Sequence, residues 1–287
     1  MGSFHGDEKR LEAQMRLAKA ELSEVNFRLV ENFKKKLLAE GISKLRIARY
    51  VSILRKIAEF NPKDFDKWND DDIIDILARI EEEDYKQGTK NEFRKTLKKF
   101  IKVMIDEYSP LLRLIKQKKK DDNSIPEVLQ EEDILKMIEA ADNYRDKALI
   151  AVGYEAGLRI GELASLKIGD IIWLTNSKGD LKAKIKVSGK TGERQIPLIM
   201  SVPYLKRWIE QHPFKDDPNA IVFCSLSPRN YGEMIGYQMM WKLVSSIGKK
   251  AGLRKRVNPH LLRHSRATVL ANHLTEAQLC EFFGWTQ

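Results

Sequence analysis

Cysteine is scarce in this sequence, and it contains no long apolar run. Only Cys224 and Cys280 occur in 287 residues, which is too few for a disulfide framework or a cysteine zinc site. No apolar run approaches the roughly 18 residues that a membrane span needs, and no secretory segment follows the N-terminus. These absences argue against a disulfide-rich or membrane-spanning protein, and we expect a protein of the reducing cytoplasm.

Patterns that bind metals are missing as well. The 41 aspartates and glutamates do not gather into an oxygen cage. His260 and His264 lack the interposed glutamate that accompanies a histidine pair on a zinc-protease helix. We therefore expect no metal and no other cofactor. An RNA-processing or metal-dependent nuclease is disfavoured because the sequence has no acidic cluster.

Positive charge is what the sequence has in excess. Lysine and arginine number 51 against 41 acids, a net charge of +10. This balance favours a polyanionic partner, although many basic proteins bind no nucleic acid. Between Lys86 and Lys120, 12 residues are basic and three are acidic. Two interpretations stand equally: a surface that follows nucleic-acid phosphates, and a solvated helix face beside a charged linker. The candidate DNA-binding residues are Lys90, Arg94, Lys95, Lys98 and Lys99, with a second group at Ser43, Lys44, Arg46 and Arg49.

Apolar residues recur at three- and four-residue spacing through the first 108 residues. The pattern predicts helices over 7–40, 44–60, 70–82 and 89–108. Short connections between four such helices predict a compact bundle. The charged stretch 116–126 has almost nothing to bury and ends in a proline, so we expect a linker there and a domain boundary near residue 120.

The second half mixes helical and strand patterns. Helices are predicted over 129–141, 144–156, 160–166, 202–211, 234–251 and 276–283, and another begins at residue 259. Strands are predicted over 170–174, 181–187 and 193–198, the last two joined by a glycine-flanked turn. The expected fold class is therefore mainly α with a small antiparallel β-sheet.

The helix that begins at Pro259 carries a candidate anion site. Asn258 is a good N-cap, and Pro259 suits the first helical position because its missing N–H would be unbonded there. This start places His260 and Arg263 three residues apart on one face, where both could meet one anion. A solvated basic helix face is the alternative.

Two further places combine charge with a defined local structure. Arg159 precedes a short helix, and Glu162 could orient its guanidinium, although ion pairs at helix joints are common. Lys190 lies in the predicted hairpin turn, where a lysine is most often exposed to solvent. Together with His260 and Arg263, these residues suit a phosphodiester: guanidiniums grip the non-bridging oxygens, and a lysine or imidazole moves a proton.

These motifs, in this order, resemble the tyrosine recombinase family, also called phage-type integrases. The resemblance is carried by Gly-Leu-Arg-Ile-Gly-Glu-Leu around Arg159, by Lys190 in its turn, by His260-Leu-Leu-Arg263-His264, and by Phe283-Gly284-Trp285. It implies a clamp around double-stranded DNA, no metal or ATP, and recombinase tetramers on DNA. By this resemblance, 1–23 is an N-terminal helical extension, 24–115 a core-binding domain, 116–126 a basic linker and 127–287 the catalytic domain.

The resemblance also implies roles for single residues. Arg159 and Arg263 would bind the scissile phosphate, with Glu162 supporting Arg159. Lys190 would protonate the departing 5′-oxygen, and His260 would be its acid/base partner. By position, Trp285 matches a histidine or tryptophan that donates to the phosphate, while an aromatic plug under the last helix is the alternative. His264 would support the site without catalytic chemistry.

One feature of the family is not matched. Its nucleophile is a tyrosine after the position of Trp285, which forms a 3′-phosphotyrosyl link, whereas the last tyrosine here is Tyr237 and the sequence stops at Gln287. Two interpretations are a sequence that stops before its nucleophile and a naturally broken copy. We expect this chain to bind DNA without cleaving it, and a non-catalytic DNA-binding module remains the alternative. The charged, cysteine-poor composition fits a mobile element of an archaeon or thermophile. For a DNA recombinase we expect a cytoplasmic protein associated with the nucleoid.

Overall fold

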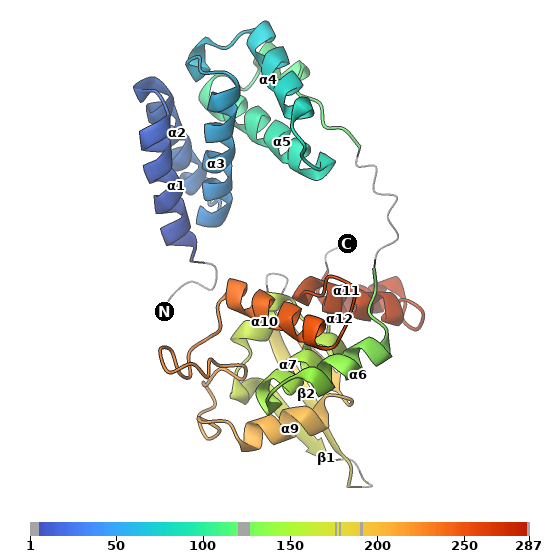
Figure 1. Cartoon of the computed structure of the whole chain (residues 1–287). Helices are drawn as coiled ribbons and strands as arrows, with labels where there is room; N and C mark the ends of the chain where they lie inside the picture. Colours follow the sequence, from blue (N-terminus) through green and yellow to red (C-terminus); the bar gives the residue numbers. More distant parts are fainter. Residues whose placement is uncertain (1–5, 120–126, 176, 178, 190–191, 286–287) are drawn as a thin grey trace. The chain divides into compact units, whose positions relative to one another are not determined.

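The computed structural model describes residues 6–119, 127–175, 177, 179–189 and 192–285. The chain divides into two compact units, Met1–Ser124 and Ile125–Gln287 (Figure 1). No helix among the described residues is long and apolar enough to cross a membrane.

The first unit is a helical bundle. Its α-helices are α1 (Asp7–Glu21), α2 (Glu24–Ala39), α3 (Lys44–Phe60), α4 (Asp70–Glu82) and α5 (Gln87–Met104). Its core contains Phe33, Phe65 and Phe100, which are fully buried and meet edge to face at ring-centroid distances of 5.2 and 5.3 Å. Edge-to-face contacts between aromatic rings have a preferred geometry in addition to burying apolar surface. They hold α2, α5 and the short turn before α4 together.

The predicted single helix over 7–40 is wrong, because the chain breaks at Ser23. The Ser23 hydroxyl accepts a hydrogen bond from the Asn26 N–H at 3.2 Å and so caps α2. Apolar residues keep the same three- and four-residue spacing on both sides of Ser23. The sequence pattern therefore did not reveal the break between the two helices. Helix α1 then packs on α3 with Leu11 and Ala18 buried in the core of the first unit.

The second unit is mainly helical with one small sheet, as expected. Its helices are α6 (Glu131–Ala140), α7 (Tyr144–Glu155), α8 (Ile160–Ser165), α9 (Val202–Glu210), α10 (Tyr237–Lys250), α11 (Pro259–Leu270) and α12 (Glu276–Phe283). Helix α7 packs between α6 and α9 (Figure 1), and eight of its residues from Ala148 to Glu155 are buried. Helix α10 begins three residues later than predicted, because Met234 pairs with Cys224 and Gly236 is the N-cap.

The sheet has the order β1-β2-β3 and is antiparallel throughout. Its strands are β1 (Ile171–Thr175), β2 (Leu181–Gly189) and β3 (Gly192–Leu198). The inward positions Ala183, Ile185 and Val187 of β2 are buried and lie opposite Leu198, Ile196 and Arg194 of β3. One inward position of a half-buried sheet therefore holds an arginine.

Two residues after the end of α7 lies a glycine that a larger residue could not replace without strain. Gly157 has φ +55°, and a Cβ built there would lie 2.4 Å from Cε1 of Phe283, the buried last residue of α12. The glycine lets the end of α12 approach the end of α7 at the point where the site described below is assembled.

We expect Gly157→Ala to lower the free energy of unfolding of the second unit more than Gly252→Ala does. Gly252 also has positive φ, but nothing lies within 4 Å of its built Cβ. Backbone strain costs about 1 to 2 kcal/mol in both variants, and overpacking against Phe283 adds about 1 to 3 kcal/mol at Gly157 alone. Urea denaturation measures both losses, and equal losses would contradict the packing argument.

Candidate active site

Glu162 lies at the centre of the candidate site. It is the third residue of α8 and 7% exposed, and its Oε2 accepts from the Arg159 backbone N–H at 2.9 Å, which caps the helix start. Its Oε1 accepts from Nη1 of Arg159 at 2.9 Å. The predicted contact between Glu162 and Arg159 is therefore present.

Two more arginines surround the same carboxylate. Arg194 donates to both oxygens of Glu162, through Nη1 at 3.1 Å and Nη2 at 2.8 Å. Arg263 of α11 lies slightly farther away, with its Nη1 4.0 Å from Oε2. One buried carboxylate thus faces three guanidinium groups.

The same three arginines bind the C-terminal end of α12. Arg194 Nε donates to the Phe282 carbonyl at 2.9 Å, Arg263 Nη2 to the Phe283 carbonyl at 2.7 Å, and Arg159 Nη2 to the Gly284 carbonyl at 2.7 Å. The last carbonyls of a helix lack intrahelical partners and carry partial negative charge, so cations stabilise them. The arginines therefore fix the end of α12 over Glu162.

Burial sets the protonation properties of this cluster. Desolvation and then the positive charge of Arg159 lower the pKa of Arg263 to about 10. Burial alone would raise the pKa of Glu162, but hydrogen bonds from Arg194 and Arg159 outweigh it and bring that pKa below its usual value. At neutral pH the cluster has three positive groups and one negative group, an arrangement that attracts an anion.

Trp285 stacks beside the cluster. Its ring lies on Phe283 with a centroid distance of 4.8 Å and an interplanar angle of 18°, and the guanidinium of Arg263 lies 5.9 Å from its ring centroid. The side chain is nevertheless 41% exposed. It therefore packs against the end of α12, as the plug interpretation expects, while part of the indole faces solvent.

The remaining predicted site residues have different surroundings. Asn258 caps α11 as predicted, with its Oδ1 accepting from the Leu261 N–H at 3.0 Å. His260 and His264 are exposed on α11, whereas Arg263 is only 8% exposed, so His260 and Arg263 do not share one exposed face. The helical spacing could not show that Arg263 points to the core. Lys190 lies outside the described residues.

Arg194 is the site residue that sequence reasoning missed. It lies on β3 two residues before the buried Ile196 and four before the buried Leu198. An arginine at an inward position of an alternating strand, just after a glycine-flanked turn, is the signal that could have found it.

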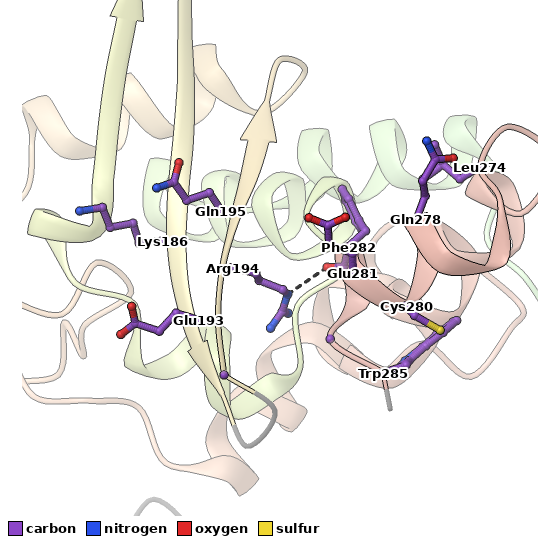
Figure 2. Close-up of a pocket in the computed structure, with 12 residues that line it drawn as sticks. Lys186, Glu193, Arg194, Gln195, Leu274, Gln278, Cys280, Glu281, Phe282 and Trp285 are labelled. Carbon is purple, nitrogen blue, oxygen red and sulfur yellow. Dashed lines mark hydrogen bonds between the residues drawn. The ribbon is translucent and has the colours of Figure 1, made fainter. Parts of the chain in front are cut away.

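A cavity of about 960 Å³ adjoins the cluster between the β2–β3 hairpin and α12 (Figure 2). Arg194 reaches across it from β3 to the Phe282 carbonyl, which the dashed line in Figure 2 marks. Polar side chains such as Lys186, Gln195 and Gln278 line its walls, and Trp285 lies at one end. No group of three or more metal-ligating side chains occurs among the described residues.

The predicted DNA-binding residues lie on α3 and α5 of the first unit. Arg46, Arg49, Lys95 and Lys98 are exposed, and we call these four residues the α3/α5 basic surface. Arg49 and Lys95 line one cavity of about 460 Å³. Several of the predicted residues also have acidic partners within the unit: Lys44 pairs with Glu8, Arg46 and Lys95 with Glu92, and Lys99 with Glu40.

The remaining predicted DNA-binding residues are differently placed. Ser43 caps α3 by accepting from the Arg46 N–H at 3.3 Å. Lys90 donates to the Glu81 carbonyl at 2.7 Å, and its side chain is 14% exposed. Arg94 is 4% exposed and pairs with the Glu81 carboxylate. The expectation that Arg94 lies on a surface facing phosphates is not met, because this arginine shares the inward face of α5 with Leu97 and Phe93.

A family model and similar sequences identify the protein family of this chain. The family model described as "Phage integrase family" matches residues 127–287, and the chain belongs to this family, whose members are tyrosine recombinases. The tyrosine recombinase XerA of Pyrococcus horikoshii is 32% identical over 248 residues, covering 85% of this chain and 80% of the relative. The tyrosine recombinase XerD of Listeria monocytogenes is 27% identical, covering 84% of each chain.

Solved structures of recombinases share the fold. A post-cleavage complex of the XerH site-specific recombinase with palindromic difH substrate matches with a TM-score of 0.67 and 22% identity, covering 99% of this chain and 90% of that chain. A lambda integrase dimer bound to a COC′ core site matches with a TM-score of 0.70 and 17% identity, covering 95% of this chain and 77% of that chain.

We expect Glu162→Gln to lower the stability of the second unit by about 3 kcal/mol at pH 7, because it leaves buried arginines without their counter-charge. A carboxyl whose pKa is lowered by folding contributes stability above its unfolded pKa, about 4.3. This contribution is lost as the pH falls through the folded value. The difference in free energy of unfolding between wild type and Glu162→Gln should therefore be smaller at pH 3 than at pH 7.

Urea denaturation at both pH values measures this difference, with Glu193→Gln as the matched control. Glu193 is an exposed acid on β3, next to Arg194, and the stability of its variant should remain close to that of wild type at both pH values. A difference at Glu162 that does not change with pH would contradict the assigned ion pairs.

Proposed function

We propose that this chain takes part in site-specific recombination of double-stranded DNA as a tyrosine recombinase, that its 287 residues bind the DNA without cleaving it, and that its arginine cluster holds the phosphodiester at the point of strand exchange. One observation carries the proposal: three guanidiniums gather around a single buried carboxylate, and one of them, Arg159, is still 36% exposed at its side chain. An anion that reaches this point meets positive charge that Glu162 alone does not balance.

The chemistry of the cluster suits phosphodiester exchange. Arg159 and Arg263 would neutralise the charge that builds up on the non-bridging oxygens as the nucleophile adds, and Trp285 would donate its indole N–H. We propose His260 and Lys190 for proton transfer, with Lys190 giving a proton to the departing 5′-oxygen. We assign His264 to a supporting position on α11. By the family's chemistry, a tyrosine hydroxyl would displace the 5′-oxygen and keep the energy of the broken bond in a 3′-phosphotyrosyl link without ATP. That tyrosine is not matched in the 287 residues, whose last tyrosine is Tyr237.

The two units would divide the work. We propose that residues 24–115 form the core-binding domain with 1–23 as its N-terminal extension, that 116–126 are a basic linker, and that 127–287 form the catalytic domain. The α3/α5 basic surface would follow the phosphate backbone. A lambda integrase tetramer bound to a Holliday junction matches this fold with a TM-score of 0.69, which supports a partnership with other recombinase subunits on DNA. We propose that this recombination takes place at the nucleoid.

We expect the 287-residue polypeptide to bind one duplex sequence selectively and to form no covalent adduct with it. The last tyrosine of the sequence is Tyr237, before the His260 motif. The measurement is selection from a randomised duplex pool, followed by denaturing electrophoresis of the protein with a nicked version of the selected duplex. Failure to enrich a sequence would contradict a site-specific function. Any covalent adduct would contradict this expectation, and one that persists in Tyr237→Phe and Tyr231→Phe would also contradict tyrosine chemistry. Selective binding without an adduct is also what a non-catalytic DNA-binding module would show.

We expect Lys95→Gln with Lys98→Gln to flatten the salt dependence of DNA binding. Each neutralised phosphate contributes about 0.9 to the slope of log K against log salt, so losing two contacts should reduce the slope by about 1.8. Fluorescence anisotropy between 50 and 300 mM salt measures it. The matched control is Lys9→Gln with Lys19→Gln, which removes the same charge from exposed positions on α1. Equal slopes in all three proteins would leave Lys95 and Lys98 as solvated surface residues.

A further inference from the structure

Arg194 has contacts that differ from those of the other two arginines. Its Nε, Nη1 and Nη2 are all engaged, with the Phe282 carbonyl and with both oxygens of Glu162. Its side chain is 9% exposed, against 36% for Arg159. The bidentate pair with a carboxylate is the strongest geometry that a guanidinium forms, so Arg194 has little to offer a phosphate directly.

We propose that Arg194 is a positioning residue, which fixes Glu162 and the end of α12 so that Arg159, Arg263 and Trp285 are held ready for a phosphodiester. This inference rests on the proposed function. It assigns to Arg194 a part in the reaction that acts through other side chains, without contact to the DNA.

The contacts explain how Arg194 could act at a distance. Glu162 accepts four hydrogen bonds, two from Arg159 and two from Arg194. Arg194 therefore supplies half of the hydrogen bonds that fix the carboxylate, and the carboxylate in turn orients the guanidinium of Arg159. Through the Phe282 carbonyl, Arg194 also holds the turn that carries Trp285. Three separate parts of the chain, β3, α8 and α12, are joined at this one side chain.

Gly189 restricts Glu162 from the other side. It ends β2 and lies opposite Gly192 in the hairpin, and a Cβ built on it would be 2.8 Å from Oε1 of Glu162. Four hydrogen bonds hold this carboxylate, so it can give way to a Cβ only by lengthening or losing some of them. Gly189→Ala should therefore displace Glu162 without changing any charge.

Lysine cannot reproduce the contacts of Arg194. A single ammonium group cannot donate in parallel to both carboxylate oxygens while also reaching the Phe282 carbonyl, as the planar fork of arginine does. Arg194→Lys keeps the positive charge and removes the geometry. It thus separates a positioning role from a general electrostatic one.

The experiment compares wild type with Arg194→Lys, Arg194→Gln and Gly189→Ala, with Lys184→Gln as the matched control. Lys184 is exposed on the outward face of β2. Thermal melting first identifies the variants that remain folded. Carbon-13 NMR titration of the free proteins then follows the Glu162 carboxyl, which is assigned by its loss in Glu162→Gln. A titration with inorganic phosphate follows the Trp285 indole N–H resonance, which is assigned by its loss in Trp285→Phe.

We expect the Glu162 carboxyl to titrate at higher pH in Arg194→Lys and Arg194→Gln than in wild type. Phosphate affinity should fall about tenfold in these two variants and in Gly189→Ala, the size expected for losing hydrogen bonds to a charged group. Lys184→Gln should match wild type in both measurements.

The outcomes distinguish the positioning role from the proposed function. If wild type binds phosphate and the folded Arg194 variants bind it equally well, the positioning role is overturned and the function stands. The positioning role is also overturned if Arg194→Lys retains wild-type phosphate affinity and Glu162 titration, because charge alone would then suffice. If no phosphate-dependent shift occurs in wild type but Glu162 titrates at higher pH in Arg194→Lys, phosphate binding by the cluster is contradicted while the control of Glu162 by Arg194 stands.

Discussion

A single buried carboxylate organises the functional part of the second unit. Glu162 accepts hydrogen bonds from Arg159 and Arg194 and lies 4.0 Å from Arg263. Burying so many charges would be costly without this pairing, because an isolated guanidinium loses its hydration on burial. With only one negative group among three positive ones, however, the compensation is incomplete. We propose that the remaining positive charge suits the cluster to a phosphodiester, so that one interaction would both stabilise the fold and prepare the site.

The C-terminal end of α12 also contributes to the balance of charge in the arginine cluster. Its last carbonyls, from Phe282 to Gly284, each accept a hydrogen bond from a different arginine. These dipoles supply part of the negative charge that a bound phosphate would supply in full. They also fix the turn before Trp285, and the absence of a side chain at Gly157 allows Phe283 to approach α7. Arg159 and Arg263, which cap this helix end, are also the residues that we propose for phosphate binding.

Local patterns predicted much of this arrangement. The cap at Asn258, the hairpin formed by β2 and β3 and the contact between Arg159 and Glu162 all follow from neighbours in sequence, and all are present. The residue positions that local spacing did not predict depend on packing between elements that lie far apart in the sequence. Arg263 and Arg94 occupy helical positions that look exposed by charge alone, but each is buried beside a carboxylate or carbonyl from another element. The sequence pattern did not identify Arg194 as a site residue, because its hydrogen-bond partners lie 32 and 88 residues away.

We propose above all that Arg159 contacts one particular phosphate of the bound DNA. The most direct test replaces single phosphates of the selected duplex by neutral methylphosphonates, one at a time, and measures the affinity of wild type and of Arg159→Gln. At one position, we expect the replacement to weaken wild type by about tenfold and to leave Arg159→Gln unchanged, since the contact is already lost. If every replacement weakens both proteins equally, the arginine cluster does not bind a phosphodiester.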